Sequence, residues 1–148
     1  MRKAAVVFAL VFGFSVLMST GPVAAQEEAE EGHLFLVMTY KGVMPEDGSE
    51  EEWEALLKEY LEAVTKKNEK IISEISLVHY FGSDNRDWVV VTEYATWADM
   101  GEAAKIDVEL AKKHWPDKKE RDEYFKKLGR YFPEHSDEIY TELPEFRK

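Results

Sequence analysis

The pattern of hydrophobic and polar positions divides the chain into an apolar leader and a longer region of alternating strand-like and helix-like segments. The leader has the basic pair Arg2 and Lys3, an apolar stretch over residues 4–18, and small residues up to Ala25. This three-part order is typical of a secretory signal peptide. The apolar stretch is shorter than the roughly 20 residues that a membrane-spanning helix needs. We therefore expect cleavage near Ala25, not a membrane anchor.

Four segments after the leader have the pattern of β-strands. Residues 26–32 are acidic and have nothing to bury, so we expect them to be disordered. Short segments rich in β-branched and aromatic residues follow, which predict strands over residues 33–41, 71–81, 87–95 and 137–143. A cluster of turn-forming residues separates the second segment from the third, so these two are expected to form a hairpin.

Helical spacing of apolar residues predicts three helices. Ser49 and Glu52 match a capping box at the start of the first helix. The apolar stripe of that helix consists of Trp53, Leu56, Leu57, Tyr60, Leu61 and Val64. Two further helices are predicted, from Thr96 to Pro116 and from Asp117 to Pro133, where each proline interrupts the helical pattern.

The resulting order predicts one domain over residues 33–148, of the α+β class. Strand, helix, strand, strand, helix in two pieces, and strand is the ferredoxin-like split βαβ arrangement (β-α-β-β-α-β). Right-handed crossovers place the last strand beside the first, and the third strand between the first and second. Helices then cover one face of an antiparallel sheet. We expect Phe35, Val37, Ile139 and Leu143 on the other face, where a second copy of the chain would cover them as a homodimer, giving a dimeric α/β barrel.

The charge balance narrows the choice of partners. The chain has 30 acidic and 19 basic residues, and loss of the leader changes the formal net charge from −11 to −13. Such a chain repels phosphate backbones and anionic headgroups, so we expect neither a nucleic acid nor a membrane-surface partner. Small neutral or cationic ligands are compatible with this charge. Cysteine is absent, so neither a disulfide nor a lipidated cysteine can form.

Histidines are the first candidates for chemistry. His33, His79, His114 and His135 have no metal-ligand spacing, so the sequence predicts no metal site and no cofactor. His79 alternates with the apolar residues of its strand, where a titratable ring could act as an acid, a base or a ligand anchor. The alternative interpretation is a structural histidine near the end of the hairpin.

Aromatic residues are the second candidates. Tyr40, Tyr80, Trp88, Tyr94 and Trp115 could line a pocket or belong to an ordinary core. Strand alternation places Leu34, Leu36, Met38 and Tyr40 on one face of the first strand, which we assign to the helix side. A pocket between sheet and helices would have Tyr40, His79, Tyr94 and His114 as its candidate ligand-binding residues.

Two stretches carry a resemblance to a known superfamily. They are HYFGSD at residues 79–84, in the hairpin, and EYATWAD at residues 93–99, which runs from strand to helix. With the element order, they resemble the dimeric α/β-barrel superfamily, which includes antibiotic-biosynthesis-type monooxygenases and stress-responsive barrel proteins. The resemblance covers residues 33–143. It implies a homodimer and a pocket between sheet and helices.

Three classes of function remain open at this point. The favoured hypothesis is an exported binding module, periplasmic or extracellular, that holds a small apolar or aromatic molecule or has a stress-related role. The alternative is a cofactor-independent monooxygenase-like enzyme acting on a small aromatic substrate in the same pocket. A purely structural or partner-binding domain is the third. No catalytic constellation stands out in the sequence, which favours the first.

Overall fold

The structure is a computed structural model that describes residues 32–82, 84–146 and 148. The expected signal peptide and residues 26–31 of the acidic segment lie outside the described residues. No helix in the described part is both long and apolar enough to cross a membrane.

The elements follow the order expected from the sequence. They are β1 (Leu34–Lys41), α1 (Glu50–Ala63), β2 (Ser73–Val78), β3 (Asp87–Tyr94), α2 (Trp97–His114), α3 (Lys118–Gly129) and β4 (Glu134–Thr141). Single 3-10 turns lie at Thr65–Lys67 and Pro144–Phe146. The ferredoxin-like α+β architecture is therefore confirmed.

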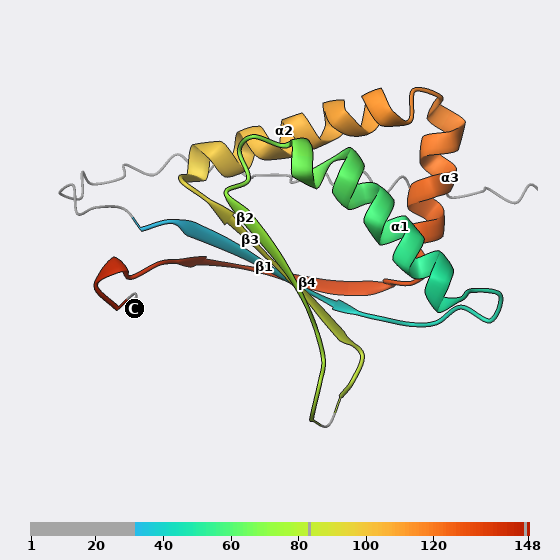
Figure 1. The fold of residues 1–148 in the computed structure, drawn as a ribbon, viewed down its shortest axis with the longest axis horizontal. Helices are drawn as coiled ribbons and strands as arrows, with labels where there is room; N and C mark the ends of the chain where they lie inside the picture. Colours follow the sequence, from blue (N-terminus) through green and yellow to red (C-terminus); the bar gives the residue numbers. More distant parts are fainter. Residues whose placement is uncertain (1–31, 83, 147) are drawn as a thin grey trace, which may run out of the picture.

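The sheet has the predicted topology. Its strand order is β2-β3-β1-β4, with antiparallel pairing throughout. All three helices lie on one side of the sheet, and the opposite side has no helix over it (Figure 1). We call this second side the open face.

The register assigns each residue of the sheet to one of these two sides. Leu36 packs against the helix side, with Tyr94, Met100 and Ala103. Ile139 is paired with Leu36 and so also faces the helices, whereas the sequence pattern predicted it on the open face. Alternation within β4 gives two faces but does not say which one points to the helices; its register with β1 decides this.

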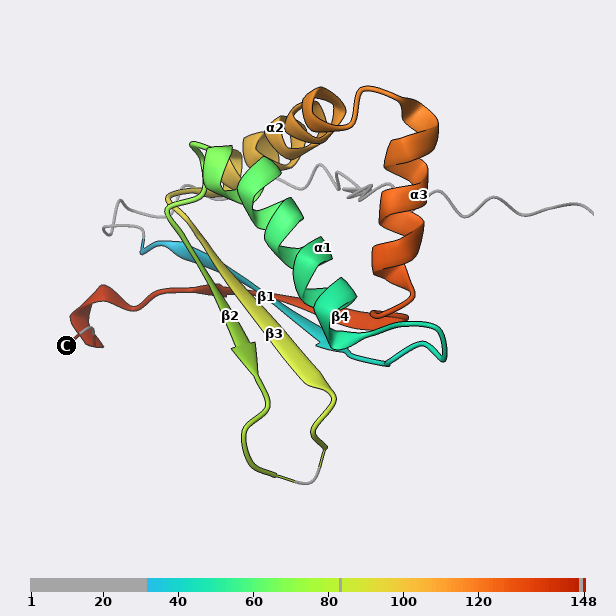
Figure 2. The ribbon, with the colours of Figure 1, turned by 45° about the vertical axis from the view of Figure 1, so that its right-hand side comes forward.

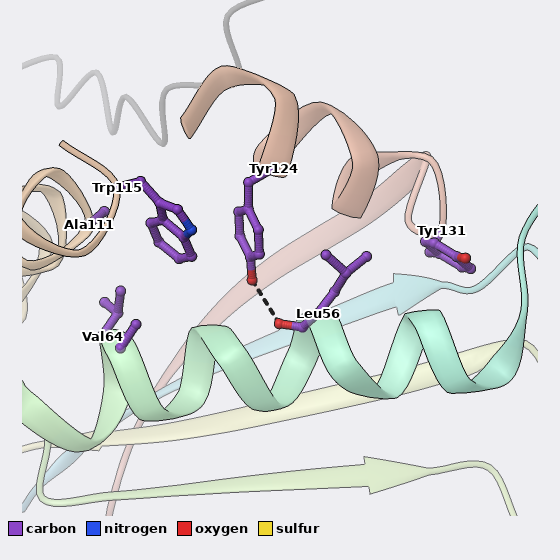
Figure 3. Packing of buried hydrophobic residues seen from close by; sticks show 7 residues of the cluster. Leu56, Val64, Ala111, Trp115, Tyr124 and Tyr131 are labelled. Carbon is purple, nitrogen blue, oxygen red and sulfur yellow. Dashed lines mark hydrogen bonds between the residues drawn. The ribbon is translucent and has the colours of Figure 1, made fainter. Parts of the chain in front are cut away.

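The main hydrophobic core lies between the helices. Leu56 and Val64 of α1 pack against Ala111 and Trp115 at the end of α2 and against Tyr124 of α3 (Figure 3). The Tyr124 hydroxyl donates a hydrogen bond of 2.7 Å to the Leu56 carbonyl oxygen, which satisfies a polar group inside this aromatic cluster. The core thus ties α3 to α1 by both packing and a buried hydrogen bond.

The helix starts agree with the sequence. The Ser49 side chain accepts from the Glu52 amide, the Thr96 side chain accepts from the Asp99 amide, and Asp117 caps α3. Glu52 departs from the expected capping box. Its carboxylate pairs with Lys127 and accepts a 2.5 Å hydrogen bond from the Tyr131 hydroxyl, so it joins the start of α1 to the end of α3.

The largest differences from the expected element boundaries are at the end of α3, the start of β4 and the end of β2. Helix α3 ends at Gly129, four residues before Pro133, because a glycine ends the helix earlier. Strand β4 begins at Glu134, since its pairing with Lys41 extends along the whole of β1. Strand β2 ends at Val78, so residues 79–81 belong to a longer hairpin loop than expected.

Candidate functional site

One carboxylate of the sheet lies on the side that the helices cover. Glu74 of β2 is paired with Thr92, and Thr92 is paired with Leu36, so all three lie on the helix side. The Thr92 hydroxyl donates a 3.1 Å hydrogen bond to Glu74 Oε2, and Thr92 itself is only 1% exposed. This buried hydroxyl orients the Glu74 carboxyl group.

A second carboxylate belongs to α2. Asn68 Nδ2 donates hydrogen bonds to Asp107 Oδ1 at 2.6 Å and to the Ala103 carbonyl oxygen at 2.9 Å. Its Oδ1 accepts from the Lys70 amide at 3.0 Å, so the Asn68 side chain, 4% exposed, is fully used. Asn68 therefore fixes the position of the Asp107 carboxyl group.

Both carboxyl groups have a raised pKa. Burial raises the pKa of Glu74, and the charge of Asp107 raises it further; burial also raises the pKa of Asp107. In the described part of the chain, no Lys, Arg or His acts on either group. Lys70 pairs instead with Asp99 and Glu102, at 2.7 and 2.9 Å. The two acids are therefore held by neutral donors alone.

The charges of these carboxyl groups also raise the pKa of three tyrosines. Burial raises the pKa of Tyr60 and of Tyr94, with further contributions from Asp107 and Glu74. Burial, Asp137 and Glu74 raise the pKa of Tyr40 to about 12. All three hydroxyls therefore stay protonated at neutral pH and can donate hydrogen bonds.

An aromatic cluster lies on the helix side of the same sheet. The ring of Tyr40 lies 5.2 Å from Trp88, 5.3 Å from Phe132 and 5.4 Å from His135, measured between ring centroids. The rings of Trp88 and Phe132 stack at 4.7 Å. Strands β1, β3 and β4 and the segment after α3 thus supply an aromatic cluster on the helix side of the sheet, toward the other end from Tyr94. We call Glu74, Asp107, Tyr40, Tyr60 and Tyr94 the interior site.

This combination of groups permits two kinds of chemistry. Ionised carboxylates and tyrosine oxygens accept hydrogen bonds from an amine or a hydroxyl group, while the rings cover the apolar part of a ligand. A carboxyl group with a raised pKa also exchanges its proton closer to neutral pH, as a general acid or base requires. In the described residues, no group of three or more His, Asp or Glu side chains is placed to hold a metal ion.

Two of the four residues predicted from the sequence belong to the interior site. Tyr40 lies at its aromatic end, and Tyr94 lies beside α2, against Met100 and Ala103. Both are affected by the charge of Glu74. The two tyrosines lie on the same side of the sheet but toward opposite ends of it, because Tyr94 is paired with Leu34, at the other end of β1 from Tyr40.

The two histidines lie elsewhere. The His79 amide donates a hydrogen bond to the Asp87 carbonyl oxygen in the hairpin. The preceding pair, Val78 and Trp88, lies on the helix side, so alternation places His79 on the open-face side. His114 Nε2 lies 3.1 Å from Glu59 Oε1 at the end of α2. About 16 Å of helix separates it from Ala103, next to Tyr94.

The aromatic residues also divide between regions. Trp115 belongs to the helical core with Tyr124, at a centroid distance of 4.1 Å, and Tyr80 is fully exposed. Trp88 alone joins Tyr40 and Tyr94 on the helix side of the sheet. The five candidate aromatics therefore do not line a common pocket.

Sequence analysis missed Glu74, Asp107 and Tyr60. Asp107 carried a usable signal, because it interrupts the apolar stripe of its helix between Ala103 and Leu110. Glu74 carried a weaker signal: it is a charged residue on the same face of its strand as Ser76 and Val78. Tyr60 was assigned to the apolar stripe of α1, and the spacing pattern carries no information about its hydroxyl group.

Comparison with known proteins identifies the fold. No protein-family model matches the chain, and no curated protein matches its sequence. Among solved structures, a NIPSNAP family protein from Agrobacterium tumefaciens str. C58 aligns with a TM-score of 0.54 and 14% identity, over 82% of this chain and 95% of that chain.

Two further structures align at a similar level. A dimeric ferredoxin-like protein from Thermobifida fusca has a TM-score of 0.51 and 7% identity, over 81% of this chain and 100% of that chain. A dimeric ferredoxin-like protein from an uncultured marine organism has a TM-score of 0.51 and 14% identity, over 80% and 94%. The resemblance drawn from the sequence is thus confirmed at the level of fold.

Proposed function

We propose that this chain is an exported small-molecule-binding domain that acts as a homodimer and holds its ligand at the interior site. The observation that carries the proposal is the pair Glu74 and Asp107, two inward-facing carboxyl groups with raised pKa and no basic partner in the described part. Burying such groups costs stability and contributes nothing to packing. A ligand that forms hydrogen bonds with these two carboxyl groups would offset the cost of burying them.

The surroundings indicate the class of ligand. Two acids and three protonated tyrosines favour a neutral or cationic polar group, and they oppose a carboxylate or phosphate. The aromatic cluster of Tyr40, Trp88 and Phe132 suits an apolar or aromatic portion. A small aromatic amine or alcohol meets both requirements.

The open face supports the homodimer. The residues that β1, β2 and β3 place at its middle are uncharged and mostly apolar; they are Val37, Thr39, Ile75, Leu77, Val89 and Val91. Ile75 and Leu77 are about half exposed in the single chain. Glu138 of β4 adds one exposed charge beside Val37, so two copies would meet through the part of the face formed by β1, β2 and β3. The Thermobifida and marine proteins of the same fold are described as dimeric, which agrees with this arrangement.

Three matched probes test the ligand site. Benzylamine, benzyl alcohol and benzoate share a ring and differ in charge, so calorimetric titration reads the preference of the site directly. We expect binding of the amine or the alcohol and none of benzoate. Asp107→Asn and Glu74→Gln should weaken amine binding, whereas Glu62→Gln, on the exposed side of α1, should not. Preferential binding of benzoate would contradict the proposal.

An enzymatic role is the second candidate. A raised pKa makes the carboxylate of Asp107 or Glu74 a stronger base, able to take a proton from a phenolic substrate. A cofactor-independent monooxygenase needs such a base, because the deprotonated aromatic substrate itself supplies electrons to dioxygen. Oxygen uptake with hydroquinones, absent in Asp107→Asn, would favour this role. Uptake at the same rate in the variant would oppose it.

A further inference from the structure

The tip of the β2–β3 hairpin presents two aromatic side chains to solvent. Tyr80 is 100% exposed and Phe81 is 93% exposed. The hairpin extends away from the three helices, so none of them covers its end (Figure 2). We call residues 78–82 the aromatic tip. Two adjacent aromatic residues with no cover are characteristic of an interaction surface.

Ion pairs hold the base of the hairpin against β1. Lys41 at the end of β1 pairs with Asp87 and, at 3.3 Å, with Asp84. Arg86 Nε and Nη2 donate to Asp84 at 2.9 and 2.8 Å, and the Arg86 carbonyl oxygen accepts from the Gly42 amide. The strand that returns from the tip is therefore anchored.

A close contact inside the aromatic tip fixes its bend. Gly82 has a φ of 150°, and a Cβ atom at this position would lie 2.7 Å from His79 Cε1. The φ favours glycine, because other residues rarely adopt it, and a larger residue would also displace the imidazole of His79. The His79 ring thus packs on Gly82, next to the two exposed aromatic residues. Tyr80 and Phe81 project from a defined turn.

We infer that the aromatic tip docks on a second copy of this chain and forms part of its dimer interface. This inference rests on the proposed homodimer. The tip continues the strand that carries Ile75 and Leu77 of the open face, so a partner lying on that face also approaches the tip.

A second copy suits this surface better than an unrelated partner. On β1, β2 and β3 the middle of the open face is uncharged, with Glu138 as the charge at its β4 side, and each copy offers the same apolar residues in return. A closed two-fold interface uses every contact twice, so both tips are buried by one association. Exposed aromatic residues are also the type that contributes most to interface affinity.

Sedimentation velocity on the exported protein tests the inference. Replacing Tyr80 and Phe81 together with serine should raise the dimer dissociation constant about 100-fold, as expected when two aromatic anchors are lost on each side. The control is Trp97→Ser, which removes an aromatic residue, 54% exposed, from the start of α2. Leu77→Asp serves as the open-face variant and should yield monomer.

The outcomes separate the tip from the homodimer. An unchanged dissociation constant in the tip variant, with monomer in Leu77→Asp, would overturn the inference and leave the homodimer intact. A wild-type protein that stays monomeric would overturn the inference and the homodimer together. Binding of benzylamine is measured independently, so the interior site is judged on its own.

A second measurement tests the inference independently, in case the serine variant does not fold. The chain has no cysteine, so Phe81→Cys introduces a single attachment point for a benzophenone photocrosslinker. We expect a covalent dimer from this position and none from Trp97→Cys. Equal yields from the two positions would overturn the inference.

Discussion

At the scale of single residues, burial decides the character of the candidate site. Glu74 and Asp107 belong to residue types that usually remain in water, yet both lie between the sheet and the helices. Each is held by a neutral buried donor, Thr92 or Asn68, and neither is compensated by a basic group in the described part. The free energy of unfolding of the chain therefore depends on whether these carboxyl groups are protonated, and this dependence can be measured as a function of pH.

The free energy of unfolding should decrease as pH rises because of Glu74. A free Glu has a pKa of about 4.3, and burial raises the pKa of Glu74 above this in the folded chain. Between those two values the folded chain binds more protons than the unfolded chain, so the free energy of unfolding decreases as pH rises. Glu74→Gln should remove this loss, making the variant more stable than wild type at neutral pH.

Urea denaturation at pH 4 and pH 7 measures the effect. Glu62→Gln is the control, because Glu62 is exposed and pairs with Lys66 on the surface of α1. The same pH dependence in Glu74→Gln as in Glu62→Gln would show that the Glu74 carboxyl group is not strained by burial.

Neighbouring leucines of α1 should differ in their contribution to stability. Leu56 is buried against the aromatic core, whereas Leu57 is only half-buried. Leu56→Ala should lower the free energy of unfolding by about 2–5 kcal/mol through a cavity, and Leu57→Ala by less. Thermal or urea unfolding compares the two, and an equal loss would contradict the assignment of the core.

At the scale of elements, turns and caps gave the sequence its strongest signals. Ser49, Thr96 and Asp117 each accept hydrogen bonds from the first turn of their helix, as their positions predicted. The hairpin was predicted from Gly82 and its polar neighbours, but its length was not. Strand β2 loses its pairing after Val78, where the His79 ring packs on the Gly82 backbone.

Gly82→Ala should disturb this hairpin selectively. The new methyl group would meet the His79 ring in a backbone conformation that alanine rarely adopts. We expect faster amide hydrogen exchange in residues 78–87 and unchanged exchange in α1 and α3. Gly101→Ala is the matched control, since open space surrounds that position in α2. Unchanged exchange in the hairpin would contradict the contact.

At the scale of the whole molecule, charge and topology act together. The strongly acidic composition opposes self-association, while β1, β2 and β3 place uncharged residues at the middle of the open face. The helices leave that face uncovered because both crossovers return on the same side of the sheet (Figure 1). The proposed homodimer would use this uncovered face.

The exported protein should begin at Gln26. The basic pair, the apolar stretch and the small residues before position 26 predict cleavage there. Intact mass of the protein recovered outside the cytoplasm checks the position. A membrane-bound species that retains residues 1–25 would contradict it.

The sequence by itself determined the order of elements, the helix starts and the strand order of the sheet. These follow from local rules: periodicity, capping residues such as Ser49, and the handedness of crossovers. Tertiary structure alone decided which polar residues became the interior site. Asp107 and Glu74 are far apart in the sequence, and the charge of one reaches the other only because α2 packs against β3, next to β2. It also set the start of β4 at Glu134, because hydrogen bonding along all of β1 outweighed the polar character of that segment.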